Sequence, residues 1–324
     1  MNRGVALITC ALFAAASGIA HSEDIKLKRD LTYKAGDGFV EVLKNGVMAA
    51  RYVYKDTPKP YIYPIIAPDG PPVTRGYPMD QIPGEATDHP HHRSFWVGFG
   101  NVNGVDFWAE GEKSGRIVQR NLDFDSPTPG HWNIHCTNDW VGPDGKVVCY
   151  EDRRYSFLSC DYGLLISTRI ELTPAGQELR FGGTKEGFLA FRLAQGMQLK
   201  NGTGHILNSE GQKDADCWGK RARWVDYTGE TKGKTVGIAV FDVPSNYGYP
   251  TYWHARDYGL LAANPFGGKD FTGEEKNESG LTIRPGQTAR FVYIALIHSG
   301  ALDAQKLDMI ADQIAGKAPP APNR

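Results

Sequence analysis

Beyond residue 20 the sequence has no apolar run long enough to cross a membrane, which excludes a protein built of several spanning helices. The formal net charge is only −1 and no block of like charge occurs, so neither nucleic acid nor an anionic membrane surface is an expected partner. Cysteine is scarce and no Cys-x-x-Cys spacing occurs, which argues against a zinc site built on thiolates. Motifs for a phosphate loop, a Gly-x-Ser-x-Gly nucleophile and a His-Glu-x-x-His metal site are also missing.

The one long apolar stretch lies at the N-terminus. Arg3 precedes a run from Val5 to Ala20 that ends in small residues, and this pattern predicts a secretory signal peptide over residues 1–20. Cleavage is expected after Ala20 or after Ser22. The run is shorter than the roughly 20 residues that a bilayer requires, which argues against an uncleaved anchor. The mature chain is therefore expected in the periplasm or outside the cell.

Export would place the cysteines of the mature chain in an oxidising compartment. Cys136 and Cys149 flank a turn sequence, Pro143-Asp144-Gly145, so a hairpin would bring them opposite each other if its register were suitable. A disulfide between them and a pair of buried free thiols are the two alternatives.

The distribution of glycine and proline indicates the fold class. Both are abundant and scattered between short runs of Val, Ile and aromatic residues, which is typical of many strands joined by turns. Strands are expected over residues 39–54 (with a turn at Asn45-Gly46), 153–158, 164–172, 188–199, 234–242, 259–263 and 289–298. A helix is expected after Gly300, with one apolar face made by Leu307, Ile310, Ala311 and Ile314. These patterns predict an all-β protein, a large antiparallel β-sandwich over residues 25–316 in one domain, with a short C-terminal helix and a disordered Pro-rich tail over 317–324.

The densest polar cluster is Asp88-His89-Pro90-His91-His92-Arg93. Because Pro90 disfavours helical geometry at His89, an extended segment is expected, with His89, His91 and Arg93 on one side and His92 on the other. Such imidazoles can orient a sugar hydroxyl, shuttle a proton or bind a metal. A divalent metal at His89, His91 and His92 stays open as an alternative, and a further ligand would have to come from Glu85, His205, Glu210 or His254. The ordinary alternative is that these rings only hydrogen-bond the loop backbone.

A second cluster runs from Tyr249 to Gly259 and places aromatic rings beside His254, Arg256 and Asp257. Rings that stack on the C–H face of a sugar, next to polar groups that bind its hydroxyls, are typical of a sugar subsite. An aromatic core layer with an Arg–Asp pair at its edge is the alternative.

Two glutamates, Glu186 and Glu210, are candidates for general acid–base chemistry if they converge on the histidines. The run 101–108 contains Asn103-Gly104, a hairpin signal, and a structural role is expected for it.

Five runs carry a resemblance to a known family. They are Asp88–Arg93, Val102–Trp108, Asn208–Gly211, Trp253–Gly259 and Ala263–Gly267. Together they resemble the bacterial family labelled PmoA-like. The resemblance implies an exported β-sandwich protein of bacteria that degrade polysaccharides, similar to the super-sandwich of galactose mutarotase, in which His and Glu act on a sugar ring. The label derives from a subunit of methane monooxygenase, but that membrane subunit consists of spanning helices, so monooxygenase activity is not expected here.

The leading hypothesis is a carbohydrate-active enzyme of the glycoside hydrolase or sugar epimerase type. In this hypothesis Glu186 or Glu210 is the base, a histidine is the acid, and Arg256 holds a hydroxyl or carboxylate of the substrate. The expected catalytic residues are His91, His92, Glu186, Glu210 and His254. The expected substrate-binding residues are His89, Arg93, Trp253, Arg256 and Asp257. A non-catalytic sugar-binding protein and a His-ligated metal protein are the alternatives.

Overall fold

The computed structural model describes residues 25–277 and 280–316. The predicted signal peptide and the predicted C-terminal tail lie outside these residues. Within them no helix is long and apolar enough to span a bilayer.

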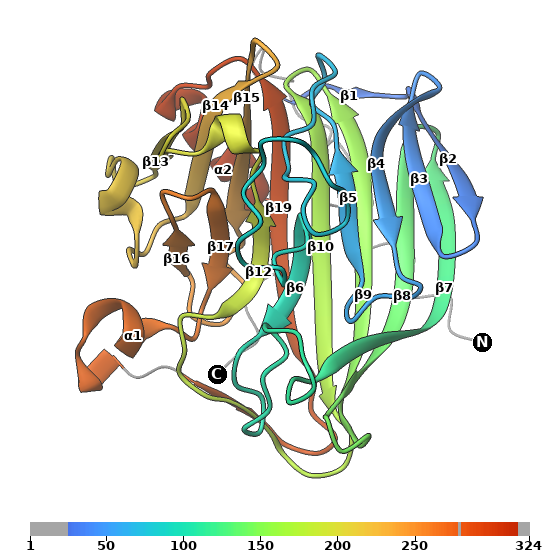
Figure 1. Ribbon diagram of the computed structural model, residues 1–324, viewed down its shortest axis with the longest axis vertical. Helices are drawn as coiled ribbons and strands as arrows, with labels where there is room; N and C mark the ends of the chain where they lie inside the picture. The colour runs from blue at the N-terminus through green and yellow to red at the C-terminus, as the bar shows by residue number, and fades with distance from the viewer. Residues whose placement is uncertain (1–24, 278–279, 317–324) are drawn as a thin grey trace.

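The described chain forms two large antiparallel sheets (Figure 1). The strands of the first sheet are β1 (Leu27–Lys28), β7 (Arg116–Thr128), β8 (His131–Val141), β9 (Val147–Cys160), β10 (Gly163–Pro174), β13 (His205–Asn208), β14 (Trp224–Thr231), β15 (Lys234–Asp242) and β19 (Ala289–Ser299). Their order is β13-β14-β15-β19-β10-β9-β8-β7, and β1 pairs with β9.

The strands of the second sheet are β2 (Leu31–Gly36), β3 (Phe39–Lys44), β4 (Val47–Val53), β5 (Tyr61–Ile65), β6 (Phe95–Phe99), β12 (Gly187–Arg192), β16 (Tyr252–Ala255) and β17 (Leu260–Asn264). Their order is β16-β17-β12-β6-β5-β4-β3-β2. A separate pair is formed by β11 (Leu179–Phe181) and β18 (Leu281–Ile283). The helical elements are α1 (Gly268–Thr272), α2 (Ala304–Gly316), and the 3-10 turns η2 (Gln195–Met197), η3 (Asp214–Cys217) and η4 (Glu275–Asn277).

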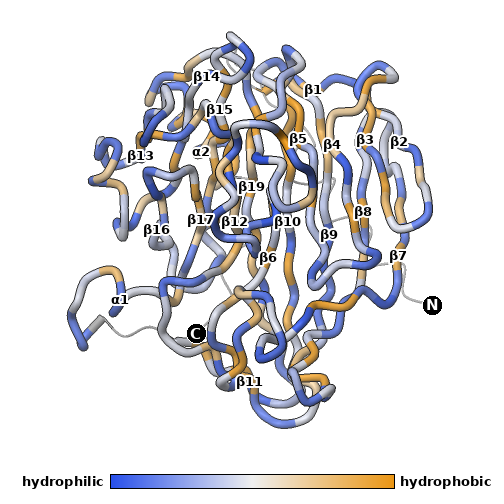
Figure 2. The backbone as a smooth tube through the Cα atoms, viewed as in Figure 1, coloured by the Kyte–Doolittle hydropathy of each residue, from blue (hydrophilic) through white to orange (hydrophobic). Residues whose placement is uncertain are grey.

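The main core lies between the two sheets. Phe95 of β6 stacks on Phe191 of β12 at a centroid distance of 4.1 Å, and it also contacts Tyr155 of β9 in the opposite sheet at 5.8 Å. Phe188 of β12 likewise contacts Phe291 of β19 in the opposite sheet, with ring centroids 5.0 Å apart. Figure 2 shows the hydrophobic residues spread along the strands and the hydrophilic residues gathered in the connecting loops. The predicted all-β sandwich is therefore confirmed.

Helix α2 covers the outer face of the first sheet. Its buried residues Leu307, Ile310, Ala311 and Ile314 are those that the sequence placed on one face. They belong to a second apolar cluster that includes Phe241 of β15. The predicted C-terminal helix is confirmed.

Most predicted strands are present, and the hairpin at Asn45-Gly46 is confirmed. Asn45 and Gly46 have φ values of 50° and 81°, the two positive angles that a tight two-residue turn needs. The strand expected over 188–199 is shorter than predicted, because β12 ends at Arg192 and residues 195–197 form η2.

Of the two alternatives for Cys136 and Cys149, the structure has the pair of buried free thiols and not the disulfide. In the β8–β9 hairpin Cys136 lies opposite Arg153 and Cys149 lies opposite Trp140, so the register separates the two thiols. Cys136, Cys149, Cys160 and Cys217 are all free and buried. Burial raises the pKa of Cys136 to about 11, so this thiol stays protonated at neutral pH.

Candidate functional site

A pocket lies on the outer face of the second sheet, away from the main core. Strand register places Tyr61, Trp96, Ala190, Ala262 and His254 in one row across β5, β6, β12, β17 and β16. Trp96, Ala190 and Ala262 belong to an apolar cluster separate from the core between the sheets. The row has only methyl side chains at Ala190 and Ala262, so it leaves room beside His254.

The pocket has a volume of about 440 Å³, within the range of small-molecule sites. Its lining comes from the turn before β6, the loop after β6, the residues before β12, and the β16–β17 hairpin. The lining residues are His89, His91, His92, Asp106, Trp108, Ala109, Lys185, Glu186, His254, Arg256 and Tyr258.

The segment His89–His92 is a turn, and the predicted extended form is wrong. The His92 N–H donates to the His89 carbonyl oxygen at 3.0 Å, and His89 adopts a φ of 45°. Proline keeps the preceding residue out of the right-handed helical region but does not prevent this left-handed geometry. As a result the three imidazoles gather on one side, with ring centroids 4.5 Å apart for His91–His92 and 4.7 Å apart for His89–His92.

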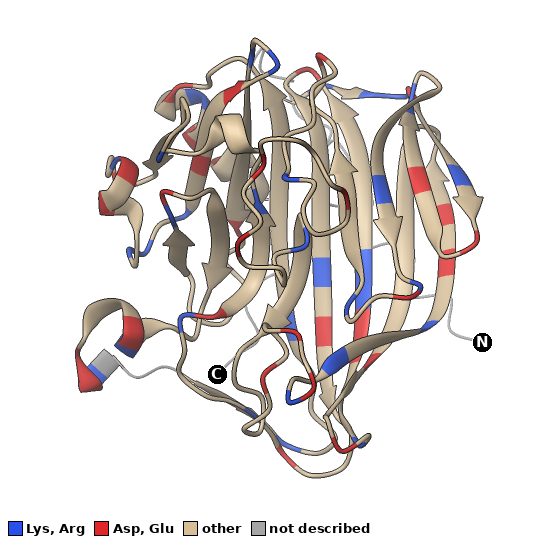
Figure 3. Ribbon diagram, viewed as in Figure 1, with Lys and Arg blue, Asp and Glu red and all other residues tan. Residues whose placement is uncertain are grey.

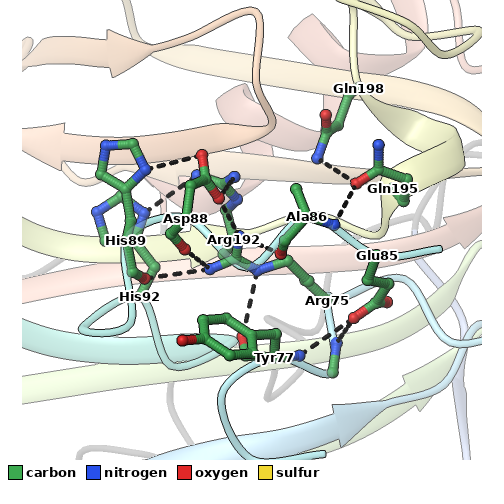
Figure 4. A network of polar contacts seen from close by, with 11 residues as sticks. Arg75, Tyr77, Glu85, Ala86, Asp88, His89, His92, Arg192, Gln195 and Gln198 are labelled. Carbon is green, nitrogen blue, oxygen red and sulfur yellow. Dashed lines mark hydrogen bonds and ion pairs between the residues drawn. The ribbon is translucent and has the colours of Figure 1, made fainter. Parts of the chain in front are cut away.

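A buried charge network holds this turn in place (Figure 4). Oδ1 of Asp88 accepts hydrogen bonds from Arg75 and from Arg192, the latter at 2.7 Å, and both guanidiniums are 0% exposed. Oδ2 of Asp88 accepts a hydrogen bond from Nδ1 of His89 at 2.9 Å. Arg75 also donates to the carbonyl oxygens of Asp88 and His89. One carboxylate therefore ties the turn to the strand β12.

Hydrogen bonds assign the tautomers of the two most deeply buried histidines. Nδ1 of His92 lies 3.2 Å from Nη1 of Arg192, and because a guanidinium only donates, the ring proton of His92 is on Nε2. Nδ1 of His254 lies 3.0 Å from the Lys185 carbonyl oxygen, which only accepts, so Nε2 of His254 carries the lone pair. Burial lowers the pKa of His254 to about 3, and burial together with the nearby His91 and Arg192 lowers the pKa of His92 far below its usual value. Both rings are neutral at neutral pH.

A second set of charges lies behind Trp108. Lys59, 2% exposed, donates to the Trp108 carbonyl oxygen and lies 3.4 Å from Glu110, and burial lowers its pKa to about 8. Burial, followed by the positive charge of Lys59, lowers the pKa of His91 to about 4. Arg93 forms two hydrogen bonds of 2.7 Å with Glu110. Arg93 is thus paired with Glu110 and is not among the residues that line the pocket, so the structure does not place it with the other predicted binding residues.

Three other predicted residues also lie outside the pocket lining. Glu210 is exposed in the turn after β13, where it accepts a hydrogen bond from Ser209. Trp253 is fully buried in the main core and donates to the Ala222 carbonyl oxygen, so it is a core residue. The Asp257 carbonyl oxygen accepts from the Lys200 N–H, and its side chain is not among the lining groups. Sequence proximity to a histidine did not determine which way these side chains point.

The remaining six predicted residues, His89, His91, His92, Glu186, His254 and Arg256, do come together. The structure adds Asp106 and Trp108 from the run 101–108, whose expected role was only structural. Oδ1 of Asp106 accepts the N–H groups of Trp108 and Ala109, which fixes this loop against the pocket. An aspartate and a tryptophan within four residues of the Asn103-Gly104 turn were the available signal.

The arrangement of the described residues gives no support to the metal alternative. Across the described ranges 25–277 and 280–316, no group of three or more His, Cys, Asp or Glu side chains is arranged to hold a metal ion. The proposed further ligand Glu85 instead accepts the backbone N–H groups of Gly76 and Tyr77.

The Asp88 network predicts a loss of stability in acid. Burial by itself raises the pKa of Asp88, but the charge of Arg192 and hydrogen bonds from Arg192, His89 and Arg75 outweigh it and lower the pKa to about 2. The stabilisation is therefore present above pH 4 and is lost as the pH falls through about 2. Because 40% of the Asp88 side chain is exposed, solvent screening limits the effect to about 1 kcal/mol.

Urea unfolding of the wild type and of Asp88→Asn, at pH 7, 4, 3 and 2, measures this effect. We expect the difference in unfolding free energy between the two proteins to shrink below pH 4. A difference that stays constant down to pH 2 would contradict the assignment.

Comparison with known proteins places the chain in a family. The model of a family of unknown function, DUF6807, matches residues 39–312. The chain belongs to the DUF6807 family. The matching model does not carry the PmoA-like label, so that resemblance stays a prediction. No curated protein matches this DUF6807 chain.

Among solved structures, the DUF6807 chain is similar to the galactosidase domain of an alpha-galactosidase–sucrose kinase, with 9% identity and a TM-score of 0.42 over 86% of this chain and 42% of that one. It is also similar to galactose 1-epimerase from Lactobacillus acidophilus NCFM, with 11% identity and a TM-score of 0.40 over 85% of this chain and 100% of that one. A galactose mutarotase-like protein from Clostridium acetobutylicum has 9% identity and a TM-score of 0.39, over 86% of this chain and 98% of that one. This chain thus spans less than half of the first structure and nearly all of the other two.

Proposed function

We propose that the pocket binds a sugar ring and catalyses proton transfer at its hemiacetal. The observation that carries this proposal is the convergence of six polar residues from three distant segments of the chain on one pocket of about 440 Å³. The predicted signal peptide supports a location in the periplasm or outside the cell.

The pocket offers the groups that a polyhydroxylated ring needs. His92 presents a donor at Nε2 and His254 presents an acceptor at Nε2, and a sugar hydroxyl can satisfy either of them. The aromatic rings of Trp108 and Tyr258 add apolar faces for the C–H groups of a sugar. A small ligand that combines an apolar ring face with several hydroxyls fits this set of contacts.

The acid and the base are assigned by their surroundings. Glu186 is the carboxylate proposed as base, and His89, whose Nδ1 is bound to the Asp88 carboxylate, is the histidine proposed as acid. Glu186 takes the proton of the C1 hydroxyl, His89 gives a proton to the ring oxygen, and the bond between C1 and the ring oxygen breaks. The product is the open-chain aldehyde, which closes again by the reverse transfers to give either anomer.

This reaction requires one acid, one base and no other reactant. Hydrolysis of a glycoside usually needs two carboxyl groups that act directly on the bond. Glu186 and Asp106 are the two carboxylates of the lining, but Oδ1 of Asp106 is occupied by two backbone N–H groups. The site therefore supports hemiacetal opening better than hydrolysis.

A second candidate, a non-catalytic sugar-binding protein, is favoured by one observation. The pKa values of His91, His92 and His254 are all lowered, so these rings serve as neutral hydrogen-bonding groups and not as proton donors near neutral pH. Among these clustered imidazoles, His89 is the one with a ring nitrogen hydrogen-bonded to a carboxylate, Oδ2 of Asp88.

Proton NMR with the wild-type protein tests both candidates. A panel of reducing monosaccharides is examined by saturation-transfer difference for binding and by exchange spectroscopy for interconversion of the two anomers. We expect binding together with anomer exchange faster than in buffer at the same pH. Binding without faster exchange would leave the non-catalytic candidate, and absence of binding for every sugar would exclude both.

A further inference from the structure

Arg256 differs from the other arginines around the pocket. It follows β16 directly, and its guanidinium carbon lies 5.8 Å from the ring centroid of Trp218 and 5.6 Å from that of Tyr258. Two aromatic rings thus hold a half-buried guanidinium at the pocket wall.

Within the described part of the chain, the Arg256 side chain has neither an ion pair nor a hydrogen bond. By contrast, Arg75 and Arg192 are paired with Asp88, and Arg93 is paired with Glu110. Neither acid of the lining forms an ion pair with Arg256: Glu186 lies 3.0 Å from Nζ of Lys185, and Oδ1 of Asp106 accepts backbone N–H groups. The five N–H donors of Arg256 therefore have no protein acceptor at this site.

Lys185 and Arg256 are the two Lys or Arg side chains that line the pocket, and of these only Lys185 has an acidic partner there, Glu186. The charges behind the lining are paired among themselves, Arg75 and Arg192 with Asp88, and Lys59 and Arg93 with Glu110. His91, His92 and His254 add no charge at neutral pH. The whole chain has a formal charge of −1, and Figure 3 shows positive and negative residues interspersed over the strands and loops. The positive charge without an acidic partner at the pocket is therefore that of Arg256.

We propose that the sugar bound here is anionic, and that Arg256 binds its negative group. This inference rests on the proposed function and narrows its substrate class. A planar guanidinium held between two rings matches the oxygens of a carboxylate or of a sulfate ester through paired N–H groups. Both a uronic acid and a sulfated sugar present this anionic group on a sugar ring.

Titration calorimetry with matched sugars tests the proposal on the intact protein. D-glucose, D-glucuronate and D-glucose 6-sulfate share one ring and differ at C6, so their affinities isolate the negative group. The same comparison is made within the series D-galactose, D-galacturonate and D-galactose 6-sulfate. We expect at least one anionic sugar to bind about 10- to 100-fold more tightly than its neutral counterpart at low salt. Added salt is expected to weaken binding of the anionic sugar and to leave the neutral sugar unchanged.

Two variants test whether Arg256 causes the preference for the anionic sugar. Arg256→Gln is expected to remove the preference for the anionic sugar over its neutral counterpart. Arg221→Gln is the matched control, because Arg221 also lies over an aromatic ring, that of Tyr252, but binds backbone carbonyls outside the pocket. Arg221→Gln should keep the full preference. Thermal melting of each variant confirms that it is folded.

The outcomes separate this inference from the proposed function. Preference for the uronate alone or for the sulfate alone identifies the anionic group. Equal affinities for neutral and anionic sugars in both series, unchanged by Arg256→Gln, would overturn the inference and leave the sugar site intact. If none of the six sugars binds but other neutral monosaccharides bind in the NMR panel, the inference alone is overturned. If no sugar binds in either experiment, the proposed function is overturned as well.

Discussion

Glu186→Gln is expected to slow anomer exchange by about 100-fold or more while sugar affinity stays within about threefold. The amide keeps the size and hydrogen-bonding capacity of Glu186 but cannot take a proton from the C1 hydroxyl. Exchange spectroscopy gives the rate, and titration calorimetry gives the affinity with the same sugar.

Glu210→Gln provides a matched control for this experiment. The chemical change is identical, and Glu210 was an equally good candidate in the sequence, but its side chain is exposed in the turn after β13 and lies outside the pocket lining. We expect normal exchange and normal affinity. If Glu186→Gln keeps full turnover, or if both variants lose it equally, the assignment of Glu186 as base is wrong.

Arg153→Met is expected to lower the free energy of unfolding by about 3–5 kcal/mol. Nε and Nη2 of Arg153 bind the two oxygens of Glu151 at 2.6 and 2.7 Å, and both side chains are 0% exposed. Removal of the guanidinium leaves a carboxylate without its counter-charge between the two sheets. Urea unfolding at pH 7 measures the loss.

Two further variants show whether the loss arises from the unpaired carboxylate. The double variant Glu151→Gln with Arg153→Met removes the charge but keeps an acceptor for Asn138 and Trp140, which bind Oε2 of Glu151 at 3.2 and 2.9 Å. It should recover part of the stability. Lys55→Met breaks an ion pair of similar length, 2.6 Å, with Asp37 on the surface, and we expect little or no change in the free energy of unfolding. Equal losses for the buried and the surface variant would contradict this interpretation.

Strands were predictable where one face is buried and the turn chemistry is explicit. The range 234–242 coincides with β15, and the Asn45-Gly46 turn sets the register of β3 and β4. The long strand β7 was missed because it lies at the edge of its sheet and most of its side chains are exposed, which leaves no alternation to detect. The sequence left the disulfide and the free thiols as alternatives because the offset of a hairpin cannot be read from the residues that flank its turn.

The candidate site was predictable as a set of residues and not as a geometry. The histidines and Glu186 could be predicted as site residues because each lies in a short polar run. Arg192 gives no such signal. A single arginine at the end of an apolar strand leaves the same sequence pattern whether its side chain faces solvent or binds a carboxylate. Its partner Asp88 lies 104 residues away, and only the tertiary fold shows that they meet.

The network around Asp88 has a consequence for ligand binding. Arg75, Arg192 and His89 are tied to this carboxylate by hydrogen bonds within the protein itself. The cost in conformational entropy of ordering the histidine turn is therefore met when the chain folds and not when a ligand arrives. Binding to such a preorganised wall retains more of its interaction energy and requires little movement of the backbone. The pocket is expected to discriminate between ligands by fit to a fixed shape and not by closing around them.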